Sequence, residues 1–126
     1  MIIGLGIDLI ETARIQDSLD RFGERFMTRV FLPGEVEYCQ QMKIPARHFA
    51  ARFAAKEAAS KAFGTGIGKS LGWKDLEVCR RDGGEPYLVL HGKAEALAKE
   101  KGIANTMVSL THHETSAAAV VILCSK

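Results

Sequence analysis

Two carboxylates stand out in this chain because each lies in a stretch that is otherwise apolar and rich in small residues. Asp8 interrupts the run MIIGLGIDLI, and Glu57 lies within RFAAKEAASKAF. A carboxylate buried without a partner costs on the order of several kcal/mol or stays protonated. Two interpretations are open for the acid in the first run. Either Asp8 or Thr12 caps the next helix, or Asp8 and Glu57 share a hard cation, which takes carboxylate oxygens.

The stretch from Arg52 to Phe63 predicts a strong helix, because it is rich in alanine and contains neither proline nor an internal glycine. Glu57 and Lys61 are neighbours on that helix, and Arg52 and Lys56 form a similar pair on its other edge. An ordinary salt-bridged helix is one interpretation of these charges, and a functional site is the other. We expect both remaining faces of the helix to be covered, one carrying Phe49, Phe53, Ser60 and Phe63, the other Ala51, Ala55, Ala59 and Ala62.

A glycine-rich segment, Gly64–Lys69, follows this helix at once, and its composition suits a phosphate ligand. It is not a P-loop, which requires G-x-x-x-x-G-K-[ST] after a strand and at the start of a helix. Here Phe63 occupies the position where the first glycine is needed, and the segment follows a helix instead of preceding one. A P-loop NTPase is therefore excluded.

Composition limits the remaining classes of protein. With 126 residues we expect one domain, residues 1–126, small enough to benefit from oligomerisation. A net charge of +2 and 7% aromatic residues do not favour nucleic acid as a partner. The three cysteines are widely spaced, which predicts buried thiols and neither disulfides nor a zinc site. The N-terminal segment lacks the basic start of a signal peptide, and no apolar run reaches the roughly 20 residues of a membrane span, so we expect a cytoplasmic protein without membrane contact.

The elements that must position these residues follow from apolar periodicity and turn residues. Residues 1–11 predict a buried strand, and residues 12–29 a helix interrupted at Gly23. Beyond the turn at 31–34, we expect a short helix at 35–42, a hairpin of 75–80 with 87–91, a helix at 92–101, and strands at 106–113 and 116–124. This order predicts an α+β fold in which a largely antiparallel sheet packs on the long central helix.

The helix predicted at 12–29 carries recurrent arginines interleaved with two phenylalanines. On a continuous helix the arginines fall within one broad face. That face is either simply solvated or a docking surface for an acidic, partly apolar partner, because arginine and aromatic residues are favoured as interface anchors. The set consists of Arg14, Arg21, Phe22, Arg25, Phe26 and Arg29.

Three segments together carry a resemblance to a known family: Gly4–Glu11 (GLGIDLIE), residues 52–68 (RFAAKEAASKAFGTGIG) and Val108–His112 (VSLTH). In this order, and over essentially the whole chain, the sequence resembles the holo-acyl-carrier-protein synthases, the small bacterial 4′-phosphopantetheinyl transferases. The resemblance implies transfer of the phosphopantetheine arm of coenzyme A to a serine of apo-acyl carrier protein, with release of adenosine 3′,5′-bisphosphate. It also implies a role in fatty acid biosynthesis and a homotrimer with each active site at a subunit interface.

The same resemblance implies roles for individual residues. Asp8 and Glu57 hold Mg²⁺, and Lys61 reaches the diphosphate and steadies the leaving group. Glu57 takes the serine proton, either directly or through a metal-bound water. The glycine loop cradles phosphate or ribose, other residues contact the coenzyme including its 3′-phosphate, and the arginine–phenylalanine set meets the acidic carrier. The loop residues are Ser60, Gly64, Thr65 and Gly66, and the coenzyme contacts are Arg52, Thr111 and His112.

Two positions depart from the family pattern. Many relatives have a lysine where this chain has Glu85, between Gly84 and Pro86, and often an aromatic residue at the position of Ser116. Both departures bear on the nucleotide contacts, and neither touches the two acids. Two alternative functions stay open: a non-enzymatic module that binds carrier protein or nucleotide, and a related transferase that serves peptide or polyketide carrier domains.

Overall fold

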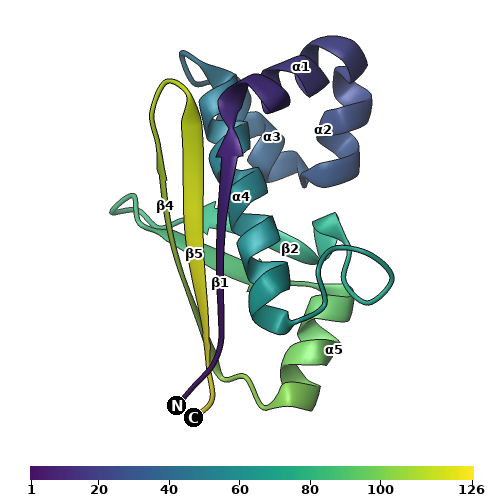
Figure 1. The fold of residues 1–126 in the computed structure, drawn as a ribbon, viewed down its shortest axis with the longest axis vertical. Helices are drawn as coiled ribbons and strands as arrows, with labels where there is room; N and C mark the ends of the chain where they lie inside the picture. Colours follow the sequence, from purple (N-terminus) through teal and green to yellow (C-terminus); the bar gives the residue numbers. More distant parts are fainter.

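The structure, a computed structural model, describes residues 1–126 and has the expected α+β architecture. In its antiparallel main sheet, β5 (Ser116–Cys124) lies between β1 (Ile2–Glu11) and β4 (Asn105–His112). A separate antiparallel hairpin consists of β2 (Leu76–Arg80) and β3 (Pro86–Leu90). Figure 1 shows the two chain ends side by side, where the amide of residue 125 donates to the carbonyl oxygen of residue 1 at 2.8 Å.

The helices begin and end at the residues that local chemistry favours. Proline starts α3 (Pro33–Gln40) and α4 (Pro45–Phe63), at a position where a helix does not need its N–H. Between α1 (Thr12–Phe22) and α2 (Glu24–Val30), Gly23 has a φ of +53°, which confirms the predicted interruption. The remaining helices are the short η1 (Trp73–Asp75) and α5 (Gly92–Lys101). None of them combines the length and the apolar composition needed to cross a membrane.

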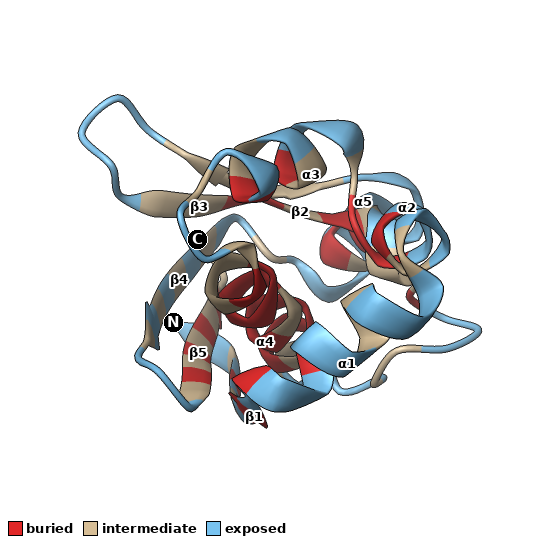
Figure 2. Ribbon diagram, turned by 90° about the horizontal axis from the view of Figure 1, so that it is seen from above, coloured by how far each residue is buried: buried red, intermediate tan, exposed pale blue.

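Helix α4 lies between the two sheets and is buried on most sides, as Figure 2 shows from above. Phe49 and Phe63 of one face are 1% and 2% exposed, and the alanines at 51, 55 and 59 of the other are at most 1% exposed. Both faces are therefore covered as predicted, except at the half-buried Phe53 and Ala62. Arg52 and Lys56 are also buried, so the expectation that both lie at its edges is wrong. Lys56 is buried in an ion pair with Glu35 of α3, and Arg52 is buried with its guanidinium over the ring of Tyr38 of the same helix. Of the three free cysteines, Cys39 is buried as predicted and the other two are only half-buried.

Strand β1 approaches α4 closely at two glycines. A Cβ atom at Gly6 would overlap the carbonyl oxygen of Ala58 and lie 2.8 Å from the amide nitrogen of Ala62. A Cβ atom at Gly4 would overlap the carbonyl oxygen of Ala62. Because side chains alternate along a strand, the even-numbered residues of β1 from Gly4 onward face α4, and Asp8 follows on the same side.

The opposite face of the main sheet is uncovered. Leu5, Ile7 and Leu9 are 64%, 67% and 72% exposed, and Met107 of β4 is 53% exposed. In the ladder, Ile122 of β5 connects Leu5 with Met107, so these apolar side chains form one continuous surface. The prediction of a buried first strand is therefore wrong for this chain by itself. The strand lies at the edge of the sheet, and only one of its faces meets α4.

Candidate functional site

Asp8 meets the C-terminal half of α4. The Lys61 ammonium donates to Asp8 Oδ1 at 3.0 Å and to the carbonyl oxygen of Ile7 at 3.1 Å. The Asp8 side chain is 15% exposed and the Lys61 side chain 51% exposed, so a solute can reach this ion pair. No side chain caps the start of α1, which excludes the capping interpretation of Asp8 and Thr12.

Glu57 lies one helical turn before Lys61 and is half-buried. Burial raises the pKa of the Glu57 carboxyl above its ordinary value, and the negative charge of Asp8 raises it further, while the Lys61 ammonium opposes both. The expected ion pair of Lys61 with Glu57 is not formed, because the ammonium turns to Asp8 instead. The structure thus brings together the three residues predicted to hold the metal and the diphosphate.

The amides of Gly64, Thr65 and Gly66, which were predicted to cradle a phosphate, are not free for a ligand. The amide of Gly64 donates to the carbonyl oxygen of Lys61 at 3.0 Å, and those of Thr65 and Gly66 donate to the carbonyl oxygen of Ser60 at 3.2 Å. This is the usual end of a helix at a left-handed glycine, in which the following amides satisfy the last carbonyl groups. The predicted phosphate cradle of amides is therefore absent from this structure. Glycine directly after the last helical residue, with lysine in the last turn, is the sequence signal for this outcome.

The two hydroxyls of the predicted cradle differ in accessibility. Ser60 is fully buried and donates to the carbonyl oxygen of Glu57 at 2.7 Å, so its hydroxyl does not face a ligand as predicted. Thr65 is exposed and donates to the carbonyl oxygen of Gly66 at 2.8 Å. Of this pair, only Thr65 is reachable from solvent.

Arg52 lies on a different side of α4. It is 2% exposed, and its Cζ atom lies 4.1 Å from the centroid of the Tyr38 ring. Its Nε and Nη1 atoms are buried without a hydrogen-bond partner. Burial raises the pKa of the neighbouring Cys39 thiol to about 12, although the charge of Arg52 opposes the shift, so this thiol is protonated and inert. A buried guanidinium with unused donors calls for an anion.

Two histidines and a second arginine extend this cluster. The rings of His48 and His112 are 4.8 Å apart, and both Nδ1 atoms, like Nε of Arg80, are buried without a partner. Burial lowers the pKa of each histidine, and nearby positive charges lower it further. His48 was missed in the sequence, although its position four residues before Arg52 places both on one face of the helix. Thr111 does not join them, because it is exposed on the opposite face of the sheet.

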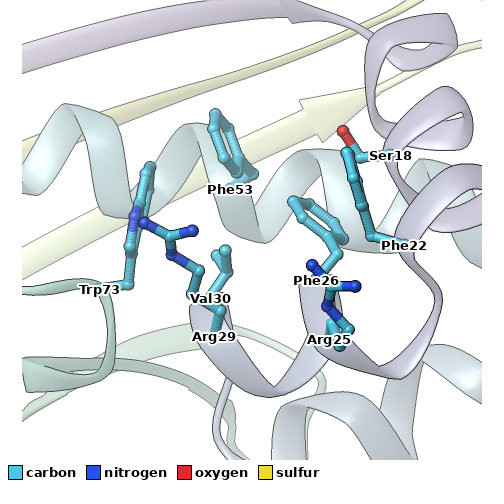
Figure 3. Close-up of a pocket in the computed structure, with 8 residues that line it drawn as sticks. All are labelled: Ser18, Phe22, Arg25, Phe26, Arg29, Val30, Phe53 and Trp73. Atoms are coloured by element: carbon cyan, nitrogen blue, oxygen red, sulfur yellow. The ribbon is translucent and has the colours of Figure 1, made fainter.

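The arginine–phenylalanine set is gathered only in part. A cavity of about 360 Å³ lies between α1, α2, α4 and η1, and we call it the docking cavity after the role that the sequence predicts for the arginine–phenylalanine set. It is lined by Ser18, Phe22, Arg25, Phe26, Arg29, Val30, Phe53 and Trp73 (Figure 3). Four predicted residues are among them. Arg14 and Arg21 are not, and Arg21 lies 3.7 Å from Asp17 in an exposed pair. The break at Gly23 separates α1 from α2, so the arginines do not share one continuous helical face as predicted.

Phe53 and Trp73 were not predicted to line a cavity. Their rings pack with centroids 4.7 Å apart. Trp73 follows an irregular segment, and no periodicity in the sequence reveals its neighbours. Phe53 lies one turn before Glu57 on the same face of α4, so the docking cavity and the Asp8–Glu57 site lie next to each other along this helix.

Known proteins match this chain over nearly its whole length. The sequence profile of the 4′-phosphopantetheinyl transferase superfamily matches residues 4–121. A holo-[acyl-carrier-protein] synthase of Koribacter versatilis is 49% identical over 123 residues, covering 98% of both chains, and one of Syntrophus aciditrophicus is 45% identical, covering 98% of this chain and 96% of the other. Among solved structures, the synthase of Neisseria meningitidis superimposes with a TM-score of 0.91 at 30% identity, covering 99% and 100% of the two chains. That of Helicobacter pylori, in complex with coenzyme A, has a TM-score of 0.85 at 31% identity, covering 95% and 99%.

Proposed function

Because this chain belongs to the holo-[acyl-carrier-protein] synthases of the 4′-phosphopantetheinyl transferase superfamily, we propose how its residues divide the reaction of that family. The protein transfers the 4′-phosphopantetheine moiety of coenzyme A to a serine of apo-acyl carrier protein, giving holo-acyl carrier protein and adenosine 3′,5′-bisphosphate. One observation carries the assignment to particular residues: Asp8, Glu57 and Lys61 converge from β1 and α4 at one point that solvent reaches.

Asp8 and Glu57 fit Mg²⁺. The Lys61 ammonium already contacts Asp8, so this carboxylate accommodates a cation. Burial and the negative charge of Asp8 raise the pKa of Glu57, and a cation shared by the two acids would oppose both effects. No group of three or more His, Cys, Asp or Glu side chains is arranged to hold a metal. Two carboxylates are enough for Mg²⁺, which uses one or two of them and completes its shell with water and substrate phosphates. Held by these residues, Mg²⁺ would neutralise charge on the diphosphate.

The transfer breaks one P–O bond and forms another. The serine oxygen attacks the phosphorus that carries the pantetheine arm, and the bond from this phosphorus to the bridging oxygen breaks. Adenosine 3′,5′-bisphosphate leaves with the electron pair. Lys61 donates to the diphosphate and stabilises the negative charge of the leaving group. Glu57 accepts the serine proton, directly or through a water.

The cluster of Arg52, Arg80, His48 and His112, which we call the arginine–histidine cluster, provides the second half of the coenzyme site. Each of these side chains has a buried nitrogen atom without a partner within the chain. The 3′-phosphate of coenzyme A is a dianionic group with several acceptor oxygens, so it matches the two guanidinium groups in charge and in hydrogen bonding. Arg80 also supplies a cation beside the hairpin turn, where Glu85 stands in place of a lysine.

The carrier protein docks at α1 and α2. The docking cavity combines aromatic walls with the charges of Arg25 and Arg29, which suits an acidic helix that places one apolar side chain in the cavity. Arg14 and Arg21 lie outside the cavity, where exposed charges mainly speed encounter.

Two observations support a homotrimer with shared sites. Arg52 and Glu57 are about 140° apart around α4, so one coenzyme reaches both most simply where two copies meet. The uncovered apolar face with Leu5, Ile7 and Leu9 is a surface that a second copy would bury.

The reaction is tested by incubating the protein with apo-acyl carrier protein, coenzyme A and Mg²⁺ and measuring the intact mass of the carrier. We expect the mass of the phosphopantetheine arm to be added. The matched control, Glu57→Gln, retains the docking cavity and should leave the carrier unmodified. A carrier that is bound but never modified by the wild-type protein would favour the non-enzymatic module.

Shared sites are tested by complementation. Glu57→Gln and a second chain with Arg52→Gln and His112→Gln are co-expressed in equal amounts and assayed at low coenzyme A. Each variant is expected to be inactive alone, whereas about a quarter of all sites combine two intact halves when the two chains assemble into trimers at random. Activity no higher than that of either variant alone would place the whole site within one chain.

A further inference from the structure

We propose that the buried ion pair of Lys56 and Glu35 is a brace that sets the shape of the docking cavity. Both are then positioning residues for the transfer, and neither touches a substrate. This inference rests on the proposed docking role of the cavity and identifies what holds its walls in place.

The Lys56 ammonium joins segments that are remote in the sequence. It donates to Glu35 Oε1 at 2.7 Å, to the carbonyl oxygen of Val30 at 2.7 Å and to that of Trp73 at 3.2 Å. All three of its hydrogens are used in this way. Val30 and Trp73 both line the docking cavity, from α2 and from η1. One fully buried cation therefore ties two walls of the cavity to α4, which contributes the third wall through Phe53.

Glu35 extends the brace on the other side. Its Oε1 atom also accepts the amide of Leu32 at 2.9 Å, and its Oε2 atom accepts the amide of Val78 at 2.9 Å. The carboxylate thus fixes the link from α2 to α3 and the middle of β2 relative to the ammonium. Both side chains are 0% exposed, so neither is available to coenzyme A or to the carrier protein.

A buried ion pair of this kind contributes more to the geometry of the fold than to its stability. Apolar residues of similar volume can replace a buried ion pair with little loss of stability, because burying two charges offsets most of their attraction. Apolar residues cannot hold two backbone carbonyl groups at a fixed place. The specific contribution of Lys56 is therefore the relative position of Val30 and Trp73, and with it the fit of the cavity to its occupant.

The test uses the neutral double variant Lys56→Met with Glu35→Gln, because Lys56→Met alone leaves a buried carboxylate without its cation. Trp73 is the only tryptophan, so its fluorescence reports on this wall directly. We expect the emission of the folded double variant to shift and the KM for carrier protein to rise about three- to tenfold, as expected when binding must order loosened groups. The KM for coenzyme A and kcat at saturating carrier should stay within about twofold of wild type. Val121→Ala, a buried truncation in β5, is the control for general destabilisation and should change neither the emission nor the carrier KM.

Arg25→Glu separates failure of the brace from failure of the docking assignment. If Arg25→Glu raises the carrier KM while the double variant leaves both KM and Trp73 emission unchanged, the brace is refuted and the docking site stands. If neither changes the carrier KM, the docking assignment fails and the brace proposal falls with it. If the double variant has a lower kcat and a higher KM for both substrates, its defect is only structural, and this result also refutes the proposal.

Discussion

Replacing Gly6 by alanine tests whether the close approach of β1 to α4 holds the Asp8 site together. The new methyl group would overlap the carbonyl oxygen of Ala58 and lie 2.8 Å from the amide nitrogen of Ala62, whereas ordinary contacts begin at 3.4 Å. The strand must therefore retreat by at least about 0.6 Å, and overpacking of this kind typically costs about 1–3 kcal/mol. Asp8, two residues further on the same face, moves with it. Since a misplacement of about 1 Å can lower a rate by about 100-fold, we expect turnover to fall by at least about tenfold.

Urea unfolding and steady-state kinetics measure the two effects of Gly6→Ala separately. With a urea dependence of about 1–3 kcal/mol per molar, the midpoint should fall by roughly 1 M. Gly68→Ala is the matched control, because a Cβ atom there meets nothing within 4 Å and Gly68 does not have a positive φ. This control should keep both stability and turnover. A Gly6→Ala protein with the wild-type midpoint and turnover would refute the claim that this contact sets the position of Asp8.

Three further outcomes are expected. Asp8→Asn or Glu57→Gln should each lower turnover by at least about 100-fold with an unchanged urea midpoint, and near-normal turnover at saturating Mg²⁺ would remove that residue from the ligand set. Arg21→Glu should raise the carrier KM about two- to fivefold, flatten its salt dependence and spare the KM for coenzyme A, whereas equal effects on both would assign α1 to the nucleotide. The lowered pKa of His48 and of His112 means that the folded chain binds fewer protons than the unfolded one, so the free energy of unfolding should decrease as pH falls below about 6.5. Urea unfolding between about pH 8 and pH 5 checks this, and a His48→Gln, His112→Gln variant with the same pH dependence would contradict it.

The residue types in the sequence identified the acids of the site, but they did not predict which groups the lysines of α4 contact. Asp8 and Glu57 attract attention in the sequence because an acid in an apolar run needs a partner, wherever that partner lies. Lys61 is four residues from Glu57, which predicts that these two pair, yet it bonds to Asp8, 53 residues away. Lys56 likewise pairs with Glu35 from another helix. A long side chain can reach several nearby groups, and the packing of other helices and strands around it determines which of them it contacts.

The first strand illustrates a different limit. The apolar residues of a strand predict that its surface is buried away from water. They do not predict which molecule covers that surface. In this chain the apolar side chains of Leu5, Ile7 and Leu9 point away from the core, so the pattern that predicted a core strand instead marks an uncovered surface. The glycine loop was misjudged for a related reason. Its composition suits both a bound anion and the end of a helix. The last carbonyl groups of α4 adjoin the amides of the loop and accept their hydrogen bonds.

One helix connects the surfaces that this reaction needs. Successive residues of α4 point in directions about 100° apart, so neighbours in the sequence serve different sites. Arg52 belongs to the arginine–histidine cluster, Phe53 lines the docking cavity, Lys56 forms the brace and Glu57 lies in the acidic site. A change at the arginine–histidine cluster or at the docking cavity should therefore affect one substrate, whereas a change at Glu57 should lower turnover. A change that shifts the helix as a whole, such as Gly6→Ala, must affect the coenzyme, the carrier and turnover together, because the same backbone positions all of them.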